Sequence, residues 1–123
     1  MVYVTLGDLP LMYRKALVEA LQILKTETGI AKVLVFGSVA RLDLHVGSDI
    51  DLIALTKYEL GASVSAHLRS EMELLETGIC VDLVVMSEEK FVSSQDRFIA
   101  RVREEGLVLL EGGEFTNVGE QLL

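Results

Sequence analysis

The chain has 123 residues, of which 19 are Asp or Glu and 11 are Lys or Arg, giving a net charge of -8 at pH 7. This length predicts a single domain, residues 1–123, and the negative charge disfavours binding to bulk nucleic acid because its phosphates would be repelled. The apolar content of 50% is high for a small soluble domain and predicts a surface covered by a partner or by a second copy in a homo-oligomer.

The sequence also bears on the cellular compartment. No apolar run approaches the roughly 20 residues of a membrane span, and the N-terminus lacks the order of a signal peptide. The single cysteine, Cys80, lies in an apolar run, so we expect it to pack as a small buried residue that forms no internal disulfide. These features predict a cytoplasmic protein.

The first half of the chain predicts one helix and two strands. Asp8 is expected to cap a helix that has Pro10 in its first turn and continues until Gly29. Its inward residues recur at helical spacing: Met12, Ala16, Leu17, Ala20, Leu21 and Leu24. Residues 31–36 predict a buried strand ended by Gly37, and residues 49–56 predict a second strand.

The second half predicts two more helices and two more strands. A helix is expected from Ser63 to Glu76, a strand over 79–86, a polar turn over 87–90, a helix over 94–105 and a strand over 107–110. The inward residues expected in these helices are Val64, Leu68, Met72 and Leu75 in the first, and Phe98, Ile99 and Val102 in the second. The tail from Gly112 is expected to be mobile. Alternating strands and helices indicate a layered α/β or α+β domain.

Two aspartates separated by one residue mark the second strand. Side chains alternate along a strand, so Asp49 and Asp51 share one face while Ile50 and Leu52 point into the core. The two carboxylates repel each other, and a divalent cation would neutralise both. Magnesium prefers oxygen ligands and usually keeps substrate phosphates among them, so the pair predicts part of a magnesium site.

A Gly-Ser pair ends the preceding strand and is expected to open a short helix. Gly37 lets the backbone approach a phosphate closely, and Ser38 adds a hydroxyl group. A third carboxylate, Asp82, interrupts an apolar strand and is costly to bury unless it joins the same site or faces a cleft. Three carboxylates can hold two metal ions, with Asp82 near the nucleophile as a ligand and general base.

The stretch GSVARLDLHVGSDIDL, followed by VDLVV, resembles the DNA-polymerase-β-like nucleotidyltransferases. Their signature is Gly-Ser, ten residues, Asp-any-Asp and a distant third Asp, matched here by Gly37, Ser38, Asp49, Asp51 and Asp82. Nearly the whole chain is similar to the minimal nucleotidyltransferases (MNT) that are paired with HEPN partners in prokaryotic toxin-antitoxin operons.

The resemblance implies a small mixed, twisted sheet flanked by helices. It also implies a magnesium-dependent transfer of a nucleoside monophosphate from a nucleoside triphosphate, with ATP as donor and Mn²⁺ as an alternative ion. In that family the antitoxin adenylylates a tyrosine of its HEPN toxin. Ser48 and Arg41 are further candidates for phosphate binding. Val39 and Leu42 depart from the family, which often has a basic or polar residue and a glycine there.

Several alternatives stay open at this stage. Asp82 can instead be a strand-edge residue facing water, and Arg41 can pair with Asp43 or with a C-terminal carboxylate. His45 and His67 are expected on the surface, because their spacing does not suit a metal pair. The glutamates Glu71, Glu73 and Glu76 are expected to form a solvated face.

Two other functions compete with protein modification. The chain can be a binding module, an antitoxin that masks its partner through an apolar face without chemistry. It can also be a small-molecule nucleotidyltransferase that works as a dimer with the acceptor bound between subunits.

Overall fold

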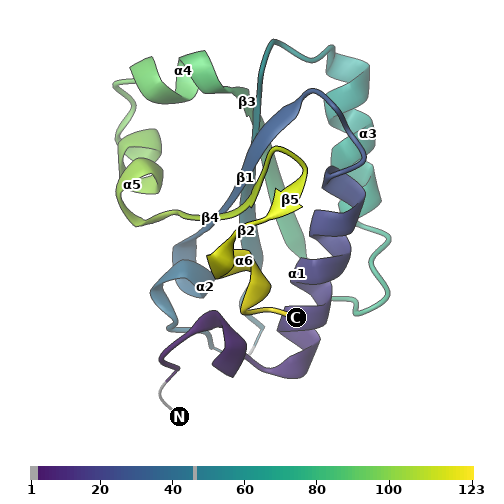
Figure 1. Ribbon diagram of the computed structural model, residues 1–123, viewed down its shortest axis with the longest axis vertical. Helices are drawn as coiled ribbons and strands as arrows, with labels where there is room; N and C mark the ends of the chain where they lie inside the picture. The colour runs from purple at the N-terminus through teal and green to yellow at the C-terminus, as the bar shows by residue number, and fades with distance from the viewer. Residues whose placement is uncertain (1–2, 46) are drawn as a thin grey trace.

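The computed structural model describes residues 3–45 and 47–123, and a five-stranded sheet crosses its centre (Figure 1). The strands are β1 (Ile30–Phe36), β2 (Ile50–Thr56), β3 (Val81–Ser87), β4 (Leu107–Glu111) and β5 (Glu114–Phe115). Their spatial order is β3-β2-β1-β4-β5, with β2 and β3 parallel and the other pairs antiparallel. The sheet is therefore mixed, and the α+β class expected from the sequence is confirmed.

Helices lie on both faces of this sheet (Figure 1). They are α1 (Leu11–Leu24), α2 (Gly37–Arg41), α3 (Ala62–Met72), α4 (Glu88–Ser93), α5 (Arg97–Glu105) and α6 (Asn117–Glu120), preceded by a 3-10 turn, η1 (Leu6–Asp8). The helices α1 and α3 pack on one face, and α4 and α5 pack on the other.

Two apolar cores result from the alternation of side chains along the strands. Ile50 and Leu52 are fully buried in the core beneath α1 and α3, as the sequence predicted. Ile53 and Leu55 point the other way, into the core that contains Phe91 of α4 and two residues of α5. Asp51 and Ile53 are two residues apart on β2, so their side chains point to the same face of the sheet, which α5 covers.

The N-terminal helix differs from its prediction at both ends. It starts at Leu11, because Asp8 belongs to η1, where its carboxylate accepts hydrogen bonds from the N–H groups of Val4 and Thr5 at 3.0 and 2.9 Å. It ends at Leu24 rather than near Gly29. Met12, expected inside, is 48% exposed.

The middle of the chain holds a helix that the sequence reading missed. The segment predicted as a polar turn is α4, whose start is capped by the Ser87 hydroxyl accepting the N–H of Lys90 at 3.3 Å. The helix α3 ends at Met72, four residues before Glu76, because the chain turns toward Gly78. The helix α5 begins at Arg97, and its Phe98, expected inside, is half exposed.

The C-terminal segment is ordered in the structure, so the expectation of a mobile tail was wrong. The Thr116 hydroxyl donates to the carbonyl of Val108 at 2.5 Å and accepts the N–H of Gly119 at 3.0 Å. Leu122 is 3% exposed in the core beneath α1 and α3. This buried leucine and the capped turn explain why a polar composition did not leave the segment loose.

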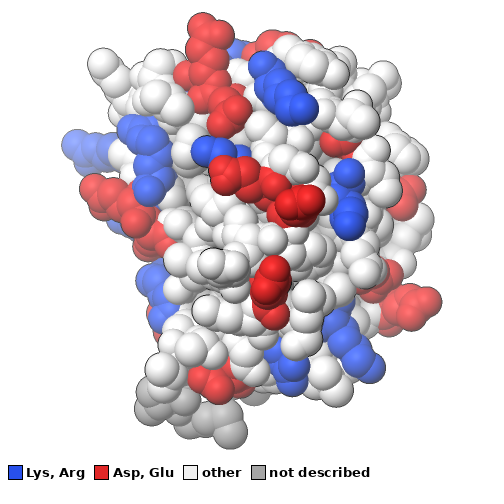
Figure 2. Space-filling model, viewed as in Figure 1, with Lys and Arg blue, Asp and Glu red and all other residues white. Residues whose placement is uncertain are grey.

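Charges are spread over the surface. Figure 2 shows acidic and basic side chains interspersed on the face in view, without one extended basic area there. No helix in residues 3–45 and 47–123 has the length and apolar character needed to cross a membrane.

Candidate active site

Two aspartates meet where the parallel strands β2 and β3 begin. Asp51 and Asp82 are direct partners in the register of these strands, and both lie on the face that carries α5. Neighbouring strands are about 4.8 Å apart, so the two carboxylates are close. The structure thus places Asp82 beside Asp51 on the neighbouring strand. Asp82 is also exposed on the edge strand β3, so it faces water as well as lying beside Asp51.

A cavity of about 370 Å³ contains both carboxylates. Its walls come from the end of β1, from α2, from the starts of β2 and β3, and from α5. The lining residues are Phe36, Gly37, Arg41, Asp51, Asp82, Val84, Phe98, Arg101, Val102 and Glu105. Three predicted site residues besides Asp82 therefore meet here: Gly37, Arg41 and Asp51.

Sequence reasoning missed the contribution of α5 to this cavity. Phe98, Arg101 and Glu105 all line it. They lie three and four residues apart, which puts them on one face of a helix. That spacing was visible in the sequence, but Phe98 was expected in the core and no role in the site was predicted for Arg101 or Glu105.

Gly37 is required where β1 turns into α2. Its φ of +70° lies in the region that residues with a side chain rarely adopt. A Cβ added at this position would lie 2.5 Å from the Oδ2 atom of Asp51. The absence of a side chain therefore lets the backbone turn and leaves room for the carboxylate.

The surroundings of Asp51 disfavour the negative charge of its carboxylate. Burial raises the pKa of Asp51 above its usual range, and the carboxylates of Asp82 and Asp49 raise it further. The positive charge of Arg41 acts in the opposite direction but is the smallest of these influences. A site that destabilises its own carboxylate in this way has affinity for a cation.

Asp49 lies outside the cavity that holds the pair. It is exposed, precedes the first residue of β2 and does not line the cavity. Within residues 3–45 and 47–123, no group of three or more Asp, Glu, His or Cys side chains is gathered closely enough to hold a metal ion. The predicted three-carboxylate cluster is therefore not formed by the described side chains, and the ligand roles of the three aspartates stay predictions.

The donor set still fits a magnesium ion. Magnesium is commonly held by one or two carboxylates together with substrate phosphates and water. Asp51 and Asp82 supply that pair of oxygen ligands, and Gly37 leaves the space beside them. The residues present are thus suited to a metal that arrives with a phosphate ligand.

Local hydrogen bonds involve the hydroxyl and carbonyl of Ser48 and the backbone carbonyl of Ser38. The hydroxyl of Ser48 accepts the N–H of His45 at 2.8 Å, and its carbonyl accepts the hydroxyl of Tyr13 at 2.6 Å. The carbonyl of Ser38 accepts the N–H of Asp43 at 3.0 Å, closing the end of α2. Neither serine lines the cavity, so their contact with phosphate stays a prediction.

Arg41 reaches the cavity but is already paired. Its Nε atom lies 3.3 Å from Asp43 Oδ2, and its Nη1 atom lies 3.1 Å from Glu105 Oε1. The hydrogen bond to Asp43 and the two carboxylate charges raise the pKa of the guanidinium. The expected pairing of Arg41 is thus observed, with Asp43 and with Glu105 of α5. Arg41 also lines the cavity, and its contact with a phosphate stays a prediction.

The two departures from the family pattern have structural explanations. Val39 is fully buried in the core beneath α1 and α3, so a side chain at this position faces away from the cavity. Leu42 ends α2 with a φ of +59°, a left-handed conformation that glycine adopts without strain. The family glycine therefore matches a backbone requirement that this chain meets with leucine.

Cys80 was wrongly expected in the core. It is exposed just before β3. Partial desolvation raises the pKa of its thiol, and the charges of Asp49 and Asp82 raise it further. His45 and His67 are exposed, as predicted.

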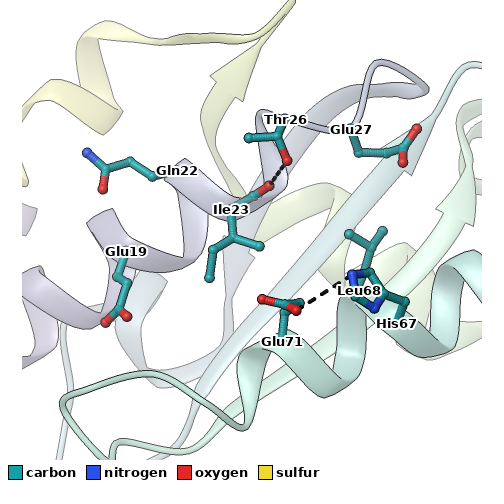
Figure 3. Close-up of a pocket in the computed structure, with 8 residues that line it drawn as sticks. All are labelled: Glu19, Gln22, Ile23, Thr26, Glu27, His67, Leu68 and Glu71. Atoms are coloured by element: carbon teal, nitrogen blue, oxygen red, sulfur yellow. Dashed lines mark hydrogen bonds and ion pairs between the residues drawn. The ribbon is translucent and has the colours of Figure 1, made fainter.

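A larger hollow of about 540 Å³ lies between α1 and α3, away from the aspartates. Figure 3 shows Glu19, Glu27 and Glu71 around it, with His67 Nε2 lying 3.6 Å from Glu71 Oε1. The three glutamates are partly exposed to solvent. The chemistry of the chain is better placed in the smaller cavity, which combines a glycine turn with two facing carboxylates.

The sequence model of the family "Polymerase beta, Nucleotidyltransferase" matches residues 19–113, which include Gly37, Asp51 and Asp82. No curated protein matches the chain significantly.

Solved structures share the fold at low sequence identity. A candidate nucleotidyltransferase from Sulfolobus solfataricus is 18% identical over 90% of this chain and 97% of its own, with a TM-score of 0.54. A toxin-antitoxin complex with AMP-PNP contains a chain 19% identical over 89% of this chain and 78% of its own, with a TM-score of 0.57. The toxin-antitoxin MntA-HepT gives 18% identity, coverage of 78% and 70%, and a TM-score of 0.55.

Proposed function

We propose a specific reaction for this chain, which belongs to the polymerase beta nucleotidyltransferase family. It transfers AMP from ATP to a hydroxyl group of a partner protein, a tyrosine of a HEPN-type toxin, and so acts as an antitoxin. The observation that carries the proposal is the facing pair Asp51 and Asp82 in a cavity that begins at Gly37. The toxin-antitoxin assemblies among the structural neighbours, one of them with AMP-PNP, support the choice of partner and nucleotide.

Each residue has a role in this reaction. Asp49, Asp51 and Asp82 would hold two Mg²⁺ ions, or Mn²⁺ in their place, with the triphosphate beside Gly37 and Ser38. Bound magnesium supplies charge neutralisation on the triphosphate and lowers the pKa of an incoming hydroxyl. Arg41 would contribute positive charge toward the phosphates, with Ser48 as a further candidate.

The transfer itself is a displacement at the α-phosphorus. The acceptor oxygen forms a bond to this phosphorus, and the bond to the bridging oxygen breaks, so pyrophosphate leaves with that electron pair. Asp82, the more exposed carboxylate, accepts the proton of the hydroxyl group. The products are the AMP ester of the acceptor and pyrophosphate.

Labelling with α-phosphate-labelled ATP and Mg²⁺ tests the proposal. Wild type and Asp51→Asn are incubated with a HEPN-type toxin, and in parallel with a cell lysate to find other acceptors. Label on a tyrosine of the toxin with wild type alone supports protein adenylylation. Label only on a small molecule would favour the dimeric small-molecule enzyme, and nucleotide binding without any transfer would contradict the catalytic proposal.

A masking antitoxin is the second candidate. Several large apolar side chains are exposed and would suit a partner surface: Val4, Leu11, Met12, Tyr58, Leu74, Val92, Phe98 and Leu123. Asp51→Asn separates the two functions, because neutralisation of the toxin should persist in this variant if contact suffices and vanish if AMP transfer is required.

A further inference from the structure

The aromatic side chain of Phe98 is held at the wall of the cavity instead of being buried. It is 49% exposed and lines the same space as Asp51 and Gly37. Its ring packs edge to face on Phe36, with 5.5 Å between the centroids and 79° between the planes. Phe36 directly precedes Gly37, so this aromatic pair adjoins the turn at which the phosphates are proposed to bind.

The position of Phe98 is fixed by its helix. The carboxylate of Asp96 accepts the N–H groups of Phe98 and Ile99 at 2.8 and 3.3 Å, which caps the start of α5. Ile99 and Val102 are buried against the sheet, and Arg103 Nη1 donates to the carbonyl of Phe91 at 2.6 Å. A ring on a helix anchored in this way is preorganised for a ligand.

We propose that Phe98 forms the nucleobase subsite of this cavity, on which the base of the bound nucleoside triphosphate stacks. The inference rests on the proposed function, which places the phosphates at Gly37. A nucleotide in that position has its polar end at the turn and the carboxylates, and its flat aromatic end must lie against another wall. Phe98 supplies an aromatic surface on that cavity, and stacking on such a surface accepts any base.

Arg101 adds a charge that complements this ligand. It lies one helical turn after Phe98 and lines the cavity, and it forms no ion pair with any residue in the described part of the chain. Arg41, the other arginine of the cavity, is bound to two carboxylates. The same face of α5 therefore offers a ring for the base and a guanidinium for an anionic group.

Binding measurements with two probes test the role of Phe98. Dissociation constants for ATP and for inorganic tripolyphosphate, both with Mg²⁺, are measured for wild type, Phe98→Ala and Phe98→Leu. Leucine keeps an apolar contact with Phe36 but lacks a ring, and thermal melting confirms that the variants fold. Val92→Ala is the matched control, because Val92 is 73% exposed on α4 and does not line the cavity.

Loss of the ring should weaken ATP binding by roughly 5- to 150-fold, the range expected for one stacked base, and leave tripolyphosphate binding unchanged. Equal weakening of both probes would overturn the subsite, because it would show a structural role. Unchanged ATP binding with a raised KM for the acceptor would also overturn it, and would assign Phe98 to the acceptor. Absence of ATP binding in wild type would overturn it as well.

The same data separate the inference from the proposed function. If wild type transfers AMP and Phe98→Leu binds ATP normally, the subsite fails and the function stands. If wild type binds ATP through Phe98 but transfers AMP to no protein, the function fails and the subsite stands.

Discussion

Gly37 lies against the carboxylate of Asp51, with space for no side chain between them. An alanine here would combine backbone strain, about 1–2 kcal/mol for a residue in the left-handed region, with a Cβ placed 2.5 Å from Asp51 Oδ2. We therefore expect Gly37→Ala to lower the free energy of unfolding and to abolish AMP transfer by displacing Asp51. Gly113→Ala is the control, because Gly113 has a φ of +80° and open space around it. Equal stability losses with activity kept in both variants would contradict the contact.

Asp51→Asn should stabilise the protein when no divalent metal is added. The substitution removes a charge that burial and the neighbouring carboxylates disfavour, so Tm should rise. Added Mg²⁺ should raise the Tm of wild type but not of the variant, and AMP transfer should fall by about 100-fold or more. Glu104→Gln, on the exposed surface of α5, controls for the change in net charge. A lower Tm of metal-free Asp51→Asn would contradict the repulsion.

Glu105→Gln should strengthen ATP binding. It removes the ion pair that holds Arg41 Nη1 at 3.1 Å and leaves this nitrogen available to a phosphate, while Nε stays paired with Asp43. A partly exposed pair of this kind is worth about 0.2–1 kcal/mol, so the dissociation constant should fall by roughly 1.5- to 5-fold. Isothermal titration measures it, with Glu104→Gln as the matched neighbour. Weaker binding in Glu105→Gln alone would show instead that the ion pair positions Arg41.

Asp8→Asn should cost stability at neutral pH and nothing in acid. Hydrogen bonds from the N–H groups of Thr5 and Val4 hold the pKa of Asp8 below its usual range. A lowered folded-state pKa means that the stabilisation is present above the unfolded value, near pH 4, and is lost as pH falls through the folded value. Denaturant unfolding from pH 7 to pH 2 should show the two stability curves converging. A constant gap over this range would contradict the charge-dependent cap.

Thr116→Val should destabilise the C-terminal segment. The hydroxyl both donates to Val108 and caps α6, so its loss should cost about 1–2 kcal/mol of unfolding free energy. Thr28→Val, on an exposed turn, should change it by less than about 0.5 kcal/mol. Hydrogen exchange of the Gly119 amide should be faster in Thr116→Val, and unchanged exchange would contradict the cap.

The strands β1 to β4 could be predicted because they depend on local patterns, whereas β5 lies in the tail that was expected to be mobile. The meeting of Gly37, Asp51 and Asp82 was predicted from the chemistry of the three carboxylates and from the motif, because strand order cannot be derived from the pattern alone. The alternation of side chains along β2 predicted which residues point into the core beneath α1 and α3. The spacing of the motif related the turn at Gly37 to Asp51. The start of α4 could have been found, since Ser87 followed by two glutamates is a capping pattern, but its polar composition resembled a turn.

The features that could not be predicted depend on tertiary packing. Phe98 is half exposed because of where α5 lies on the sheet. The helical spacing of apolar residues in the sequence does not give this position. Cys80 continues an apolar run in the sequence, yet β3 begins one residue later and leaves it outside. The separation of Asp49 from the carboxylate pair depends in the same way on where β2 starts.

The parallel register of β2 and β3 also bears on folding fidelity. A slip of one residue would turn Asp82 from the cavity to the opposite face, among the leucines beneath α1 and α3. Burying an unpaired carboxylate there would be strongly unfavourable, so Asp82 disfavours this misaligned register. Asp82, proposed as the general base, thus also favours the correct alignment of β2 and β3. Variants with a neutral residue at this position should misfold more often, even though their native state has less repulsion between carboxylates.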